Sequence, residues 1–565
     1  MTTTFPKGHS TFEPCGRCVY INKIMEIHET NEVLLVLEYD YNGRMVTTTL
    51  PRGNLKKSVL LDYAKEGMDV FEHTVITLIK YLQWQEESIE PLTGHKNVGW
   101  DIYIDDDGVK CDFFKGYKGL GYASEYLGDF IIKPEGKKRE YQDFISKHIL
   151  GTPLELAVAV GLAAVLVGFI GSEVECDNLF VHIFGDTSSG KTTFGVVAVG
   201  MGSKPEFKGQ TLARRYNGTE NALLQVMVGN TGLPVCFDEA KEAKIRDFSS
   251  FIYSIESGTE KLRLDRDASV RNVGEYHTSI VSTGEFSLSD DSERATGKEI
   301  RLQQFGNIVW TRSAKESELI KGFFRKKYGT PCALLALHLL KIGREAAIQC
   351  FTRNREKFIR HSRVMDTFTE RLSIKYGMIL AAAELANEAM DFNLSHDAIL
   401  EMLIQNELET SECRDIAQIA YDYVLGQINI FYCDHFALLI FTNKMEIVPP
   451  KKETWGLRVI HKPLKKINKK KCYLTVYVQK DKMLEILLKG NFKDISVIIK
   501  KWKERDLLDY EAGRNTRFRK ISQTGTKVHV YGLRVFDNPN KDPAEQDANP
   551  AGIGVTKTAE GWPRD

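Results

Sequence analysis

The chain has 565 residues, of which 42% are hydrophobic and 27% charged, the composition of a folded protein with about three or four domains. Lys+Arg and Asp+Glu both number 76, which excludes an overall field that draws the whole molecule to polyanions, so any nucleic-acid site must be a local patch. The ten cysteines are scattered and the N-terminal residues lack a charged-then-apolar signal peptide, so we expect a cytoplasmic protein with reduced thiols.

Residues 1–135 are predicted to form a β-rich N-terminal domain. Asn42-Gly43 is a strong signal for a tight hairpin turn between two alternating runs. Two runs with helical spacing follow within residues 55–87, and residues 97–116 return to strand. The three alternating runs at the start are residues 18–27, 32–41 and 44–50.

Cys15 and Cys18 form half of a zinc motif, with His9 and His28 nearby. Structural zinc takes four ligands, often as two paired sets, and the sequence contains no second Cys-x-x-Cys pair. Two reduced thiols at the start of a strand are the simpler interpretation, and zinc binding stays open at this point.

Residues 140–410 alternate strand and helix, which predicts the α/β fold class with a parallel sheet. The segment 154–173 resembles a membrane span, but its uninterrupted apolar run of about 16 residues is shorter than the roughly 20 that a span needs. Its Ala and Gly content suits close helix packing. We therefore expect a buried helix beside a nucleotide site and no membrane association.

Residues 178–202, NLFVHIFGDTSSGKTTFGVVAVGMG, indicate a phosphate loop. An apolar strand precedes GDTSSGKT, which fits the pattern G-x-x-x-x-G-K-[ST], and a helix follows it. We expect Lys191 to reach the β- and γ-phosphate oxygens of ATP and Thr192 to hold Mg²⁺. The predicted ATP-binding residues of this motif are Gly185, Asp186, Thr187, Ser188, Ser189, Gly190, Lys191, Thr192 and Thr193.

LPVCFDEA at 233–240 supplies the expected acidic half of the site. LPVCF reads as an apolar strand, with Asp238 predicted to bind Mg²⁺ through water and Glu239 to polarise the attacking water. The next strand, TSIVSTG at 278–284, ends in Ser282 and Thr283, either of which is placed to sense the γ-phosphate. A solvated turn is the alternative for the two carboxylates.

A cation near the γ-phosphate raises hydrolysis by roughly 10³–10⁵-fold in NTPases of this kind. Arg294 and Arg301, the latter expected at the start of the strand IRLQQF, follow the sensor and are candidates for this role. Such an arginine tends to face away from its own nucleotide, which suggests action on a neighbouring subunit within a ring. Arg371, on a later predicted helix, is a candidate second cationic sensor; surface charge is the alternative for each.

The stretch between the acidic motif and the sensor strand reads as a basic hairpin. EKLRLDR, then DAS, then VRNVGEYHTSIV predicts two strands around a tight turn. In a ring ATPase that acts on nucleic acid, this hairpin points into the channel and contacts a phosphate backbone. An exposed hairpin made soluble by charge is the alternative. The predicted DNA-binding residues are Lys261, Arg263, Arg266 and Arg271.

Five features resemble a family of mobile-element ATPases that includes the self-loading replicative helicases of staphylococcal cassette chromosomes and pathogenicity islands. They are IYSIESGTEKLRL at 252–264, VSTGE at 281–285, GKEIR at 297–301, NVGW at 97–100 and the helix around Arg371. The resemblance covers about residues 15–400. It implies an AAA+ P-loop core, a hexameric, minichromosome-maintenance-like ring that unwinds DNA, and a C-terminal winged helix.

Residues 430–536 are predicted to form a basic, winged-helix-like domain. Two runs with helical spacing precede a β-hairpin with a basic first arm, which is the order of a winged helix. A solvated face on a small packing domain is the alternative, and residues 537–565 are predicted to be a disordered tail. The expected wing residues are Arg514, Arg517, Arg519 and Lys520, and a lysine-rich run occupies residues 444–471.

The sequence therefore predicts an ATP-dependent DNA helicase that starts replication of a mobile genetic element. We expect a homo-hexamer with single-stranded DNA in its channel, ATP and Mg²⁺ between subunits, and duplex DNA at the C-terminal domain. Two alternatives stay open: an ATP-switched replication initiator that binds DNA without processive unwinding, and a protein-remodelling ring ATPase.

Overall fold

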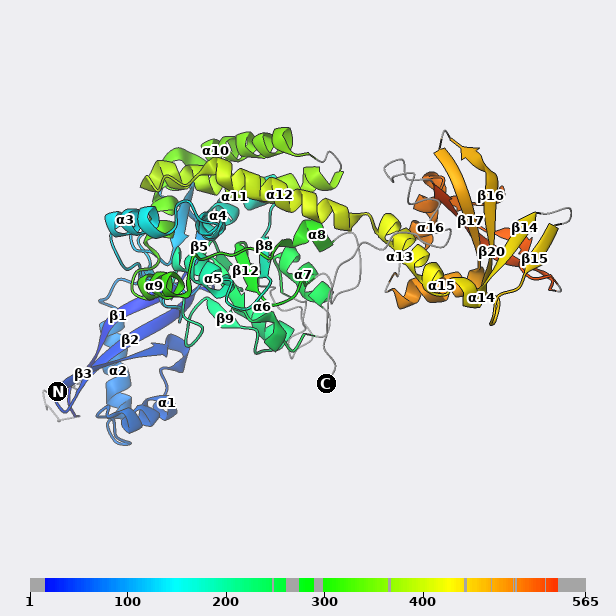
Figure 1. The fold of residues 1–565 in the computed structure, drawn as a ribbon. Helices are drawn as coiled ribbons and strands as arrows, with labels where there is room; N and C mark the ends of the chain where they lie inside the picture. Colours follow the sequence, from blue (N-terminus) through cyan, green and yellow to red (C-terminus); the bar gives the residue numbers. More distant parts are fainter. Residues whose placement is uncertain are drawn as a thin grey trace, which may run out of the picture. The chain divides into compact units, whose positions relative to one another are not determined.

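The computed structural model describes residues 16–245, 248–260, 274–288, 298–363, 367–441, 445–468, 470–490, 492, 495–523 and 525–536. The described residues up to Leu408 form one compact unit, and those from Glu409 onward form a second. Figure 1 shows the order of the elements along the chain. The predicted basic hairpin residues Lys261 to Arg271, together with Arg294, Cys15 and the tail, lie outside the described residues.

The chain begins with a five-stranded sheet in the order β3-β2-β1-β4-β7. Asn42 and Gly43 both have positive φ, 53° and 77°, as the hairpin turn between β2 and β3 requires. Helix α2 packs its apolar side on this sheet, where Leu35, Leu37 and Leu82 are fully buried. The elements are β1 (Val19–Ile27), β2 (Glu32–Tyr41), β3 (Arg44–Pro51), α1 (Lys57–Asp62), α2 (Val75–Glu86), β4 (Leu92–His95) and β7 (Glu125–Tyr126).

A three-stranded sheet in the order β10-β5-β6 joins the N-terminal region to the following α/β layer. Its strands are β5 (Val98–Ile104), β6 (Lys110–Lys115) and β10 (Asn230–Thr231). Gly99 has φ +92°, and a Cβ there would lie 2.1 Å from the carbonyl oxygen of Thr231. The indole of Trp100 donates a hydrogen bond to the Val165 carbonyl at 2.7 Å. Gly99 and Trp100 of the motif NVGW thus contact the backbone of Thr231 and Val165, which are distant in the sequence.

The main core of the first unit includes residues on both sides of the predicted boundary at 135–140. Trp100 and Phe114 pack in one buried cluster with Phe169 and with the strands of the α/β layer. β1–β3 and α2 have a separate, smaller cluster. Residues 98–115 therefore share their core with the α/β layer rather than with the first sheet.

The α/β layer contains a parallel five-stranded sheet in the order β13-β8-β12-β11-β9. Its three central strands, β8, β12 and β11, are buried along their length except at Phe184, as in parallel sheets covered on both faces. All five strands end at the same edge, and the functional side chains gather there. The strands are β8 (Leu179–Phe184), β9 (Ala213–Arg215), β11 (Val235–Asp238), β12 (Ser279–Thr283) and β13 (Gln303–Gly306).

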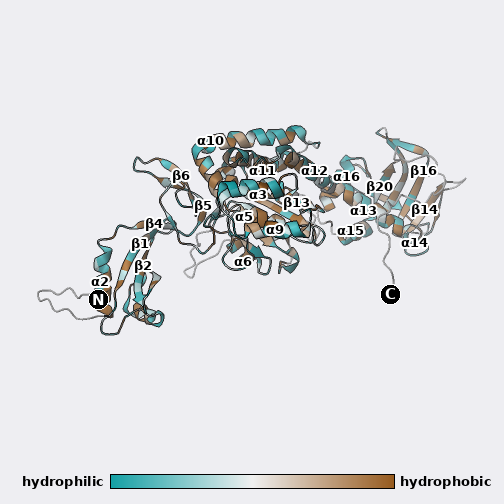
Figure 2. Cartoon of the chain, turned by 60° about the vertical axis from the view of Figure 1, so that its left-hand side comes forward, coloured by the Kyte–Doolittle hydropathy of each residue, from teal (hydrophilic) through white to brown (hydrophobic). Residues whose placement is uncertain are grey.

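Helix α4 (Leu154–Ile170) is the most apolar helix of the unit and packs against α5, α10 and α11. The stretch Leu154–Val174 is long and apolar enough to cross a membrane, and 94% of its apolar window is buried inside the fold. Hydrophilic residues lie instead on helices such as α3 and α10 (Figure 2). The sequence prediction of a buried helix at this position is confirmed.

The remaining helices of the first unit surround the parallel sheet. Helix α10 changes direction at Gly343, whose φ of 79° is not helical. These helices are α3 (Lys138–His148), α5 (Lys191–Gly200), α6 (Glu220–Gln225), α7 (Phe248–Ser257), α8 (Lys298–Arg301), α9 (Ala314–Phe324), α10 (Thr330–His361), α11 (Thr367–Met390) and α12 (His396–Arg414), which continues past the unit boundary.

The expected position of Arg301 at the start of a strand is wrong. Arg301 is the last residue of α8, and β13 begins at Gln303. The side-chain amide of Gln303 donates to the Ile300 carbonyl at 2.9 Å and so satisfies one carbonyl that the helix end leaves without a backbone partner.

The second unit is a mixed sheet in the order β15-β14-β16-β17-β20-β18, with β19 paired to β20. Helices α13, α15 and α16 share one buried cluster with this sheet, and Trp502 of α16 donates to the Ala417 carbonyl at 2.6 Å. The elements are α13 (Ile416–Ile430), α14 (Tyr432–His435), β14 (Phe436–Phe441), β15 (Met445–Val448), β16 (Gly456–Ile467), β17 (Lys470–Gln479), α15 (Lys480–Lys489), α16 (Ile495–Glu504), β18 (Leu508–Asp509), β19 (Arg517–Lys520) and β20 (Lys527–Phe536).

The predicted helix, helix, hairpin order is present as α15, α16 and β19–β20. The lysine-rich run 444–471 was not predicted to form strands. It lies largely in β15, β16 and the start of β17. Lysines on consecutive positions hide the alternation by which a half-buried strand is recognised.

The contact between α4 and α5 yields a stability prediction. A Cβ at Gly161 would lie 2.4 Å from the Ala198 carbonyl oxygen, so Gly161→Ala is expected to destabilise the fold by about 1–3 kcal/mol, measured by chemical denaturation. Gly322→Ala in α9 is the matched control, because nothing lies within 4 Å of its Cβ position. The control should gain about 0.5–1 kcal/mol from helix propensity. A Gly161→Ala protein as stable as wild type would contradict this packing.

Candidate functional site

The loop between β8 and α5 has the backbone that a phosphate-binding loop needs. Gly185, Ser188 and Gly190 have positive φ values of 132°, 69° and 92°. A Cβ at Gly190 would lie 2.9 Å from the hydroxyl oxygen of Thr311, so the position also needs a residue without a side chain. The loop ends directly at the N-terminus of α5, where backbone N–H groups lack helical partners and favour anions.

Lys191 lies over this loop. Its ammonium group donates to the carbonyl oxygens of Gly185 and Asp186 at 2.9 and 2.6 Å. Ser189 adds a hydrogen bond from its hydroxyl to the Asp186 carbonyl at 3.0 Å. The lysine therefore holds the loop curled and sits where phosphate oxygens can take the place of the two carbonyls.

Three predicted residues from three elements meet at the edge of the parallel sheet. The carboxylate of Asp238, at the end of β11, accepts hydrogen bonds from the Thr283 hydroxyl at 2.5 Å and the Thr192 hydroxyl at 3.2 Å. Asp238 is only 3% exposed. Oxygen ligands of this kind are those that Mg²⁺ prefers, with water and phosphate completing its shell.

Burial sets the acidity of both carboxyl groups at this edge. It raises the pKa of Asp238, and the hydrogen bonds from Thr283 and Thr192 only partly offset this effect. Burial also raises the pKa of Glu239, and the neighbouring negative charge of Asp238 adds to the shift. Glu239 has φ +64°, an unfavourable region for a residue with a side chain, and its backbone N–H donates to the Thr283 hydroxyl at 3.2 Å.

Ser282 and Thr283 face different surroundings. Thr283 contacts Asp238, whereas the Ser282 hydroxyl lies 2.8 Å from both the His182 ring and the Tyr216 hydroxyl. This second network is fully buried, and burial lowers the pKa of His182 to about 4. Of the two sensor candidates, the structure brings Thr283 to the acidic pair.

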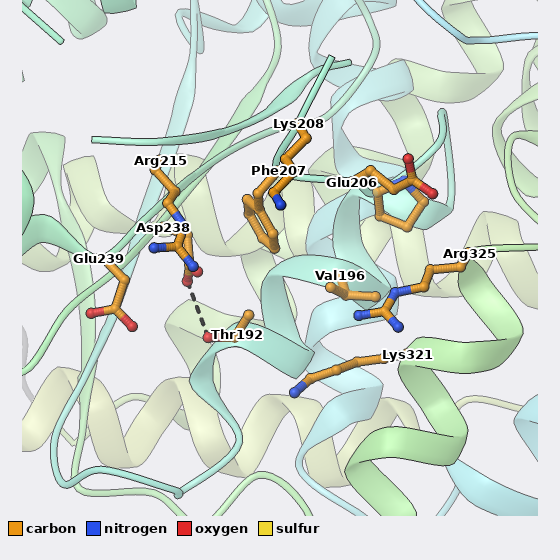
Figure 3. Close-up of a pocket in the computed structure, with 11 residues that line it drawn as sticks. Thr192, Val196, Glu206, Phe207, Lys208, Arg215, Asp238, Glu239, Lys321 and Arg325 are labelled. Atoms are coloured by element: carbon orange, nitrogen blue, oxygen red, sulfur yellow. Dashed lines mark hydrogen bonds between the residues drawn. The ribbon is translucent and has the colours of Figure 1, made fainter. Parts of the chain in front are cut away.

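A pocket of about 580 Å³ opens beside Thr192 and Asp238. Figure 3 shows that Lys321 and Arg325 extend toward it from α9, while Arg215 approaches from β9. Helix α9 is held against α5 by a buried hydrogen bond of 2.6 Å between the hydroxyls of Thr193 and Ser317. The lining residues are Thr192, Val196, Pro205, Glu206, Phe207, Lys208, Arg215, Asp238, Glu239, Lys321 and Arg325.

The four cations of this pocket were not predicted from the sequence. Lys321 and Arg325 are four residues apart on a helix, a spacing that places them on one face and would have been the available signal. Lys208 precedes β9 and Arg215 ends it, and no motif marks either. Arg215 lies beside Asp238, whereas Lys321 and Arg325 lie across the pocket from Asp238 and Glu239.

The arginines predicted to act near the γ-phosphate lie elsewhere. The Arg301 guanidinium lies 4.7 Å from the ring centroid of Tyr253 on α7. Arg371 is exposed on α11, and neither residue lines the pocket. Arg294 lies outside the described residues. The role of these three residues remains a prediction.

The residues that flank the predicted basic hairpin are paired with each other. Thr259 and Glu275 form an antiparallel bridge, and the backbone N–H of Glu260 donates to the Gly274 carbonyl at 2.9 Å. On α11, the buried Lys375 forms a 3.2 Å ion pair with Glu256 of α7. The base of the 261–273 segment is thus antiparallel and fixed between α7 and β12.

The described residues around Cys18 form no zinc site. On the predicted wing, two arginines contact other side chains of the second unit. Cys18 is an exposed free thiol, and no group of three or more His, Cys, Asp or Glu side chains in the described part of the chain could hold a metal ion. Arg517 pairs with Asp509 at 2.7 Å, and Arg519 lies 4.1 Å from the Tyr477 ring centroid.

Comparisons with known proteins agree with the sequence motifs. Residues 4–275 match the profile of a domain of unknown function, DUF927, and residues 415–538 match the Cch helix turn helix domain. No curated protein sequence matches the chain. These two matches and the structural likeness below confirm the resemblance to mobile-element helicases.

The fold is similar to a solved structure described as "SCCmec type IV Cch - active helicase". The TM-score is 0.72 at 20% identity, covering 92% of this chain and 93% of the other. The NrS-1 C terminal region in its A form apo structure gives a TM-score of 0.24 at 10% identity, covering 76% and 96%, and carries no argument. The chain therefore has an α/β fold like that of a helicase, with a helix-turn-helix-like C-terminal region.

The buried carboxylate yields a prediction about pH and stability. Because the folded-state pKa of Asp238 is raised, the favourable contribution of its protonated form is present below the unfolded-state pKa and is lost as the pH rises through the folded-state pKa. We expect Asp238→Asn to raise Tm at pH 7.5 without Mg²⁺, by an amount that shrinks as the pH falls. Asp186→Asn, an exposed change in the same loop, is the control. A lower Tm for Asp238→Asn at pH 7.5 would contradict the assignment.

Proposed function

We propose that this chain is an ATP-dependent DNA helicase with an AAA+ P-loop core, which works as a homo-hexameric ring in the cytoplasm and starts replication of a mobile genetic element. The observation that carries the proposal is the meeting of Thr192, Asp238 and Thr283 directly beside the loop 185–190. The likeness of the fold to a structure described as an active helicase supports it.

The residues present fit ATP and Mg²⁺. The positive-φ positions of the loop open its backbone N–H groups toward an anion, and Thr192 and Asp238 offer two adjacent oxygens to a hard cation. Magnesium, when bound, neutralises charge on the phosphates. Lys191 then exchanges its two loop carbonyls for β- and γ-phosphate oxygens.

Glu239 orients the attacking water and takes its proton. Its raised pKa brings the carboxylate closer to the operating pH, where a general base is most effective. Thr283 touches both Asp238 and the backbone of Glu239, so the state of the γ-phosphate is transmitted to β12. Lys321 and Arg325 add positive charge from the same chain along the pocket wall.

The ring supplies the remaining cation from a neighbouring subunit. Arg301 does not line the pocket of its own chain, which fits the predicted role toward the next subunit, and Arg371 stays a candidate second cationic sensor. The described residues on either side of 261–273 pair with each other in an antiparallel bridge between α7 and β12, which supports a channel hairpin with Lys261, Arg263, Arg266 and Arg271 on single-stranded DNA.

Substitution of the phosphate-loop lysine tests the motor assignment. We expect Lys191→Ala to lower DNA-stimulated ATP hydrolysis about 100-fold or more and to abolish unwinding of a forked duplex, because a preorganised charge at the phosphates is lost. Lys147→Ala, an exposed change on α3, should behave as wild type. Unwinding at the wild-type rate by Lys191→Ala would exclude an ATP-driven motor at this site.

The double variant Lys261→Ala with Arg263→Ala tests the ring and its hairpin together. We expect it to keep basal ATP hydrolysis and the mass of a hexamer with ATP analogue and single-stranded DNA, but to lose strand displacement. Lys65→Ala with Arg139→Ala removes two exposed cations as the control.

Two outcomes of this experiment separate the alternatives. A wild-type protein that remains monomeric with nucleotide and oligonucleotide in excess contradicts the ring. Binding and ATP hydrolysis without displacement on long duplexes, in wild type, would favour the non-processive initiator.

A further inference from the structure

The distal half of the β16–β17 hairpin is a concentrated cationic surface in the second unit. Residues 462–471 read KPLKKINKKK and contain no acidic residue. β16 is buried from Gly456 to Val459 but exposed from Lys462 to Lys466. The turn of this hairpin lies beside the residues that follow α16, where the Asn468 amide donates to the Asp506 carboxylate. We call its five described lysines the distal lysines: Lys462, Lys465, Lys466, Lys470 and Lys471.

The distal lysines keep their charge free within the unit. None of them forms an ion pair with a carboxylate of the described residues, and Lys470 lies 5.8 Å from the Phe536 ring centroid. Other lysines of the same unit are neutralised at short distance, as Lys452 is by Asp434 at 2.7 Å and Lys489 by Glu485 at 2.9 Å. The hairpin therefore carries unpaired positive charge, whereas other lysines of the unit are paired with carboxylates.

The strand register places lysines on both faces of the hairpin. Lys466 is directly opposite Lys471, so these two share one face. Lys465 shares the other face with Ile467, and Ile467 is directly opposite Lys470. Two like charges directly opposite each other destabilise a strand pair, so the pairing of Lys466 with Lys471 opposes folding and fits the binding of a polyanion.

The two surfaces expected to carry DNA in a winged helix are less suited to phosphate binding. On α16, Lys500 lies 4.0 Å from Glu504 and Trp502 is buried against α13. On the β19–β20 wing, Arg517 is held by Asp509, a carboxylate that is only 5% exposed. Lys500 and Arg517 each lie close to a carboxylate of the same unit.

We propose that the β16–β17 hairpin, and not α16, holds the phosphate backbone of duplex DNA. A two-stranded ribbon fits the major groove, where lysines on its two faces lie toward the two flanking backbones. Lysine contacts to phosphate position the protein without reading sequence, so the binding is independent of base sequence and sensitive to salt. The inference rests on the proposed function for its DNA partner and assigns where that partner's duplex portion is held.

A salt series with the full chain tests this assignment. The probe is a fluorescent blunt duplex of about 30 base pairs, followed by anisotropy without nucleotide, and the variant carries Lys→Gln at all five distal lysines. Because each phosphate contact contributes about 0.9 to the slope of log affinity against log salt, we expect that slope to fall by up to about 4.5 and affinity to fall about tenfold or more.

Three companion proteins make the result specific. The Lys→Arg variant at the same five positions keeps the charge and should bind as wild type does, which separates charge from folding. Lys500→Gln with Lys501→Gln and Lys503→Gln on α16 should retain most duplex affinity. Lys147→Ala, an exposed change on α3, should bind the blunt duplex as wild type does, because the hairpin lies in the other unit.

The outcomes distinguish this inference from the proposed function. Equal affinity and equal salt slope for the Lys→Gln variant and wild type would overturn it, as would a larger loss for the α16 variant. Loss of binding to phosphatidylserine vesicles without loss of duplex binding would assign the hairpin to a membrane surface and would also overturn it. ATP hydrolysis stimulated by single-stranded DNA, measured on the same samples, should not change; its absence in wild type would instead count against the helicase.

Discussion

The site depends on one buried carboxylate. Asp238 is removed from water at the end of β11, and hydroxyls from α5 and β12 donate to it. Burial alone would favour the protonated form, so the two hydroxyls and nearby cations are what keep the group available as an anion. Parallel strands make this possible because β11 and β12 end at the same edge, next to the loop that follows β8. The order of the parallel strands therefore determines which side chains meet around Asp238.

A few contacts connect this edge to the rest of the first unit. Thr283 ends β12, and the residues before β12 pair with the residues that follow α7 on either side of 261–273. Lys375 ties α7 to α11 through a buried ion pair with Glu256. A buried pair of this kind is costly to break by losing one partner, so α7 and α11 are expected to move together. The described residues that flank 261–273 therefore lie between α7 and β12, the strand that ends at Thr283.

Local patterns predicted the elements that have strict local requirements. The phosphate loop, the strand before Asp238 and the Asn42-Gly43 hairpin each follow from residues adjacent in sequence. Arg301 was misplaced because the end of α8 is set by a side-chain bond from Gln303, which no periodicity reveals. The cations of α9 were missed because their place beside Asp238 depends on tertiary packing through Thr193 and Ser317. In β16, consecutive lysines concealed a strand whose other half is buried.

The close approach of Gly99 and Trp100 to distant backbone has a consequence for how such chains can change. β5 borrows its partner strand from residues 230–231, and the Trp100 indole is bonded to α4. Residues before about 135 therefore do not form an independent module. A genetic exchange with its crossover near residue 135 would combine Trp100 of one parent with α4 and β10 of the other. In such recombinants the contacts of β5 and Trp100 would be mismatched, whereas a crossover near residue 408 keeps each compact unit whole.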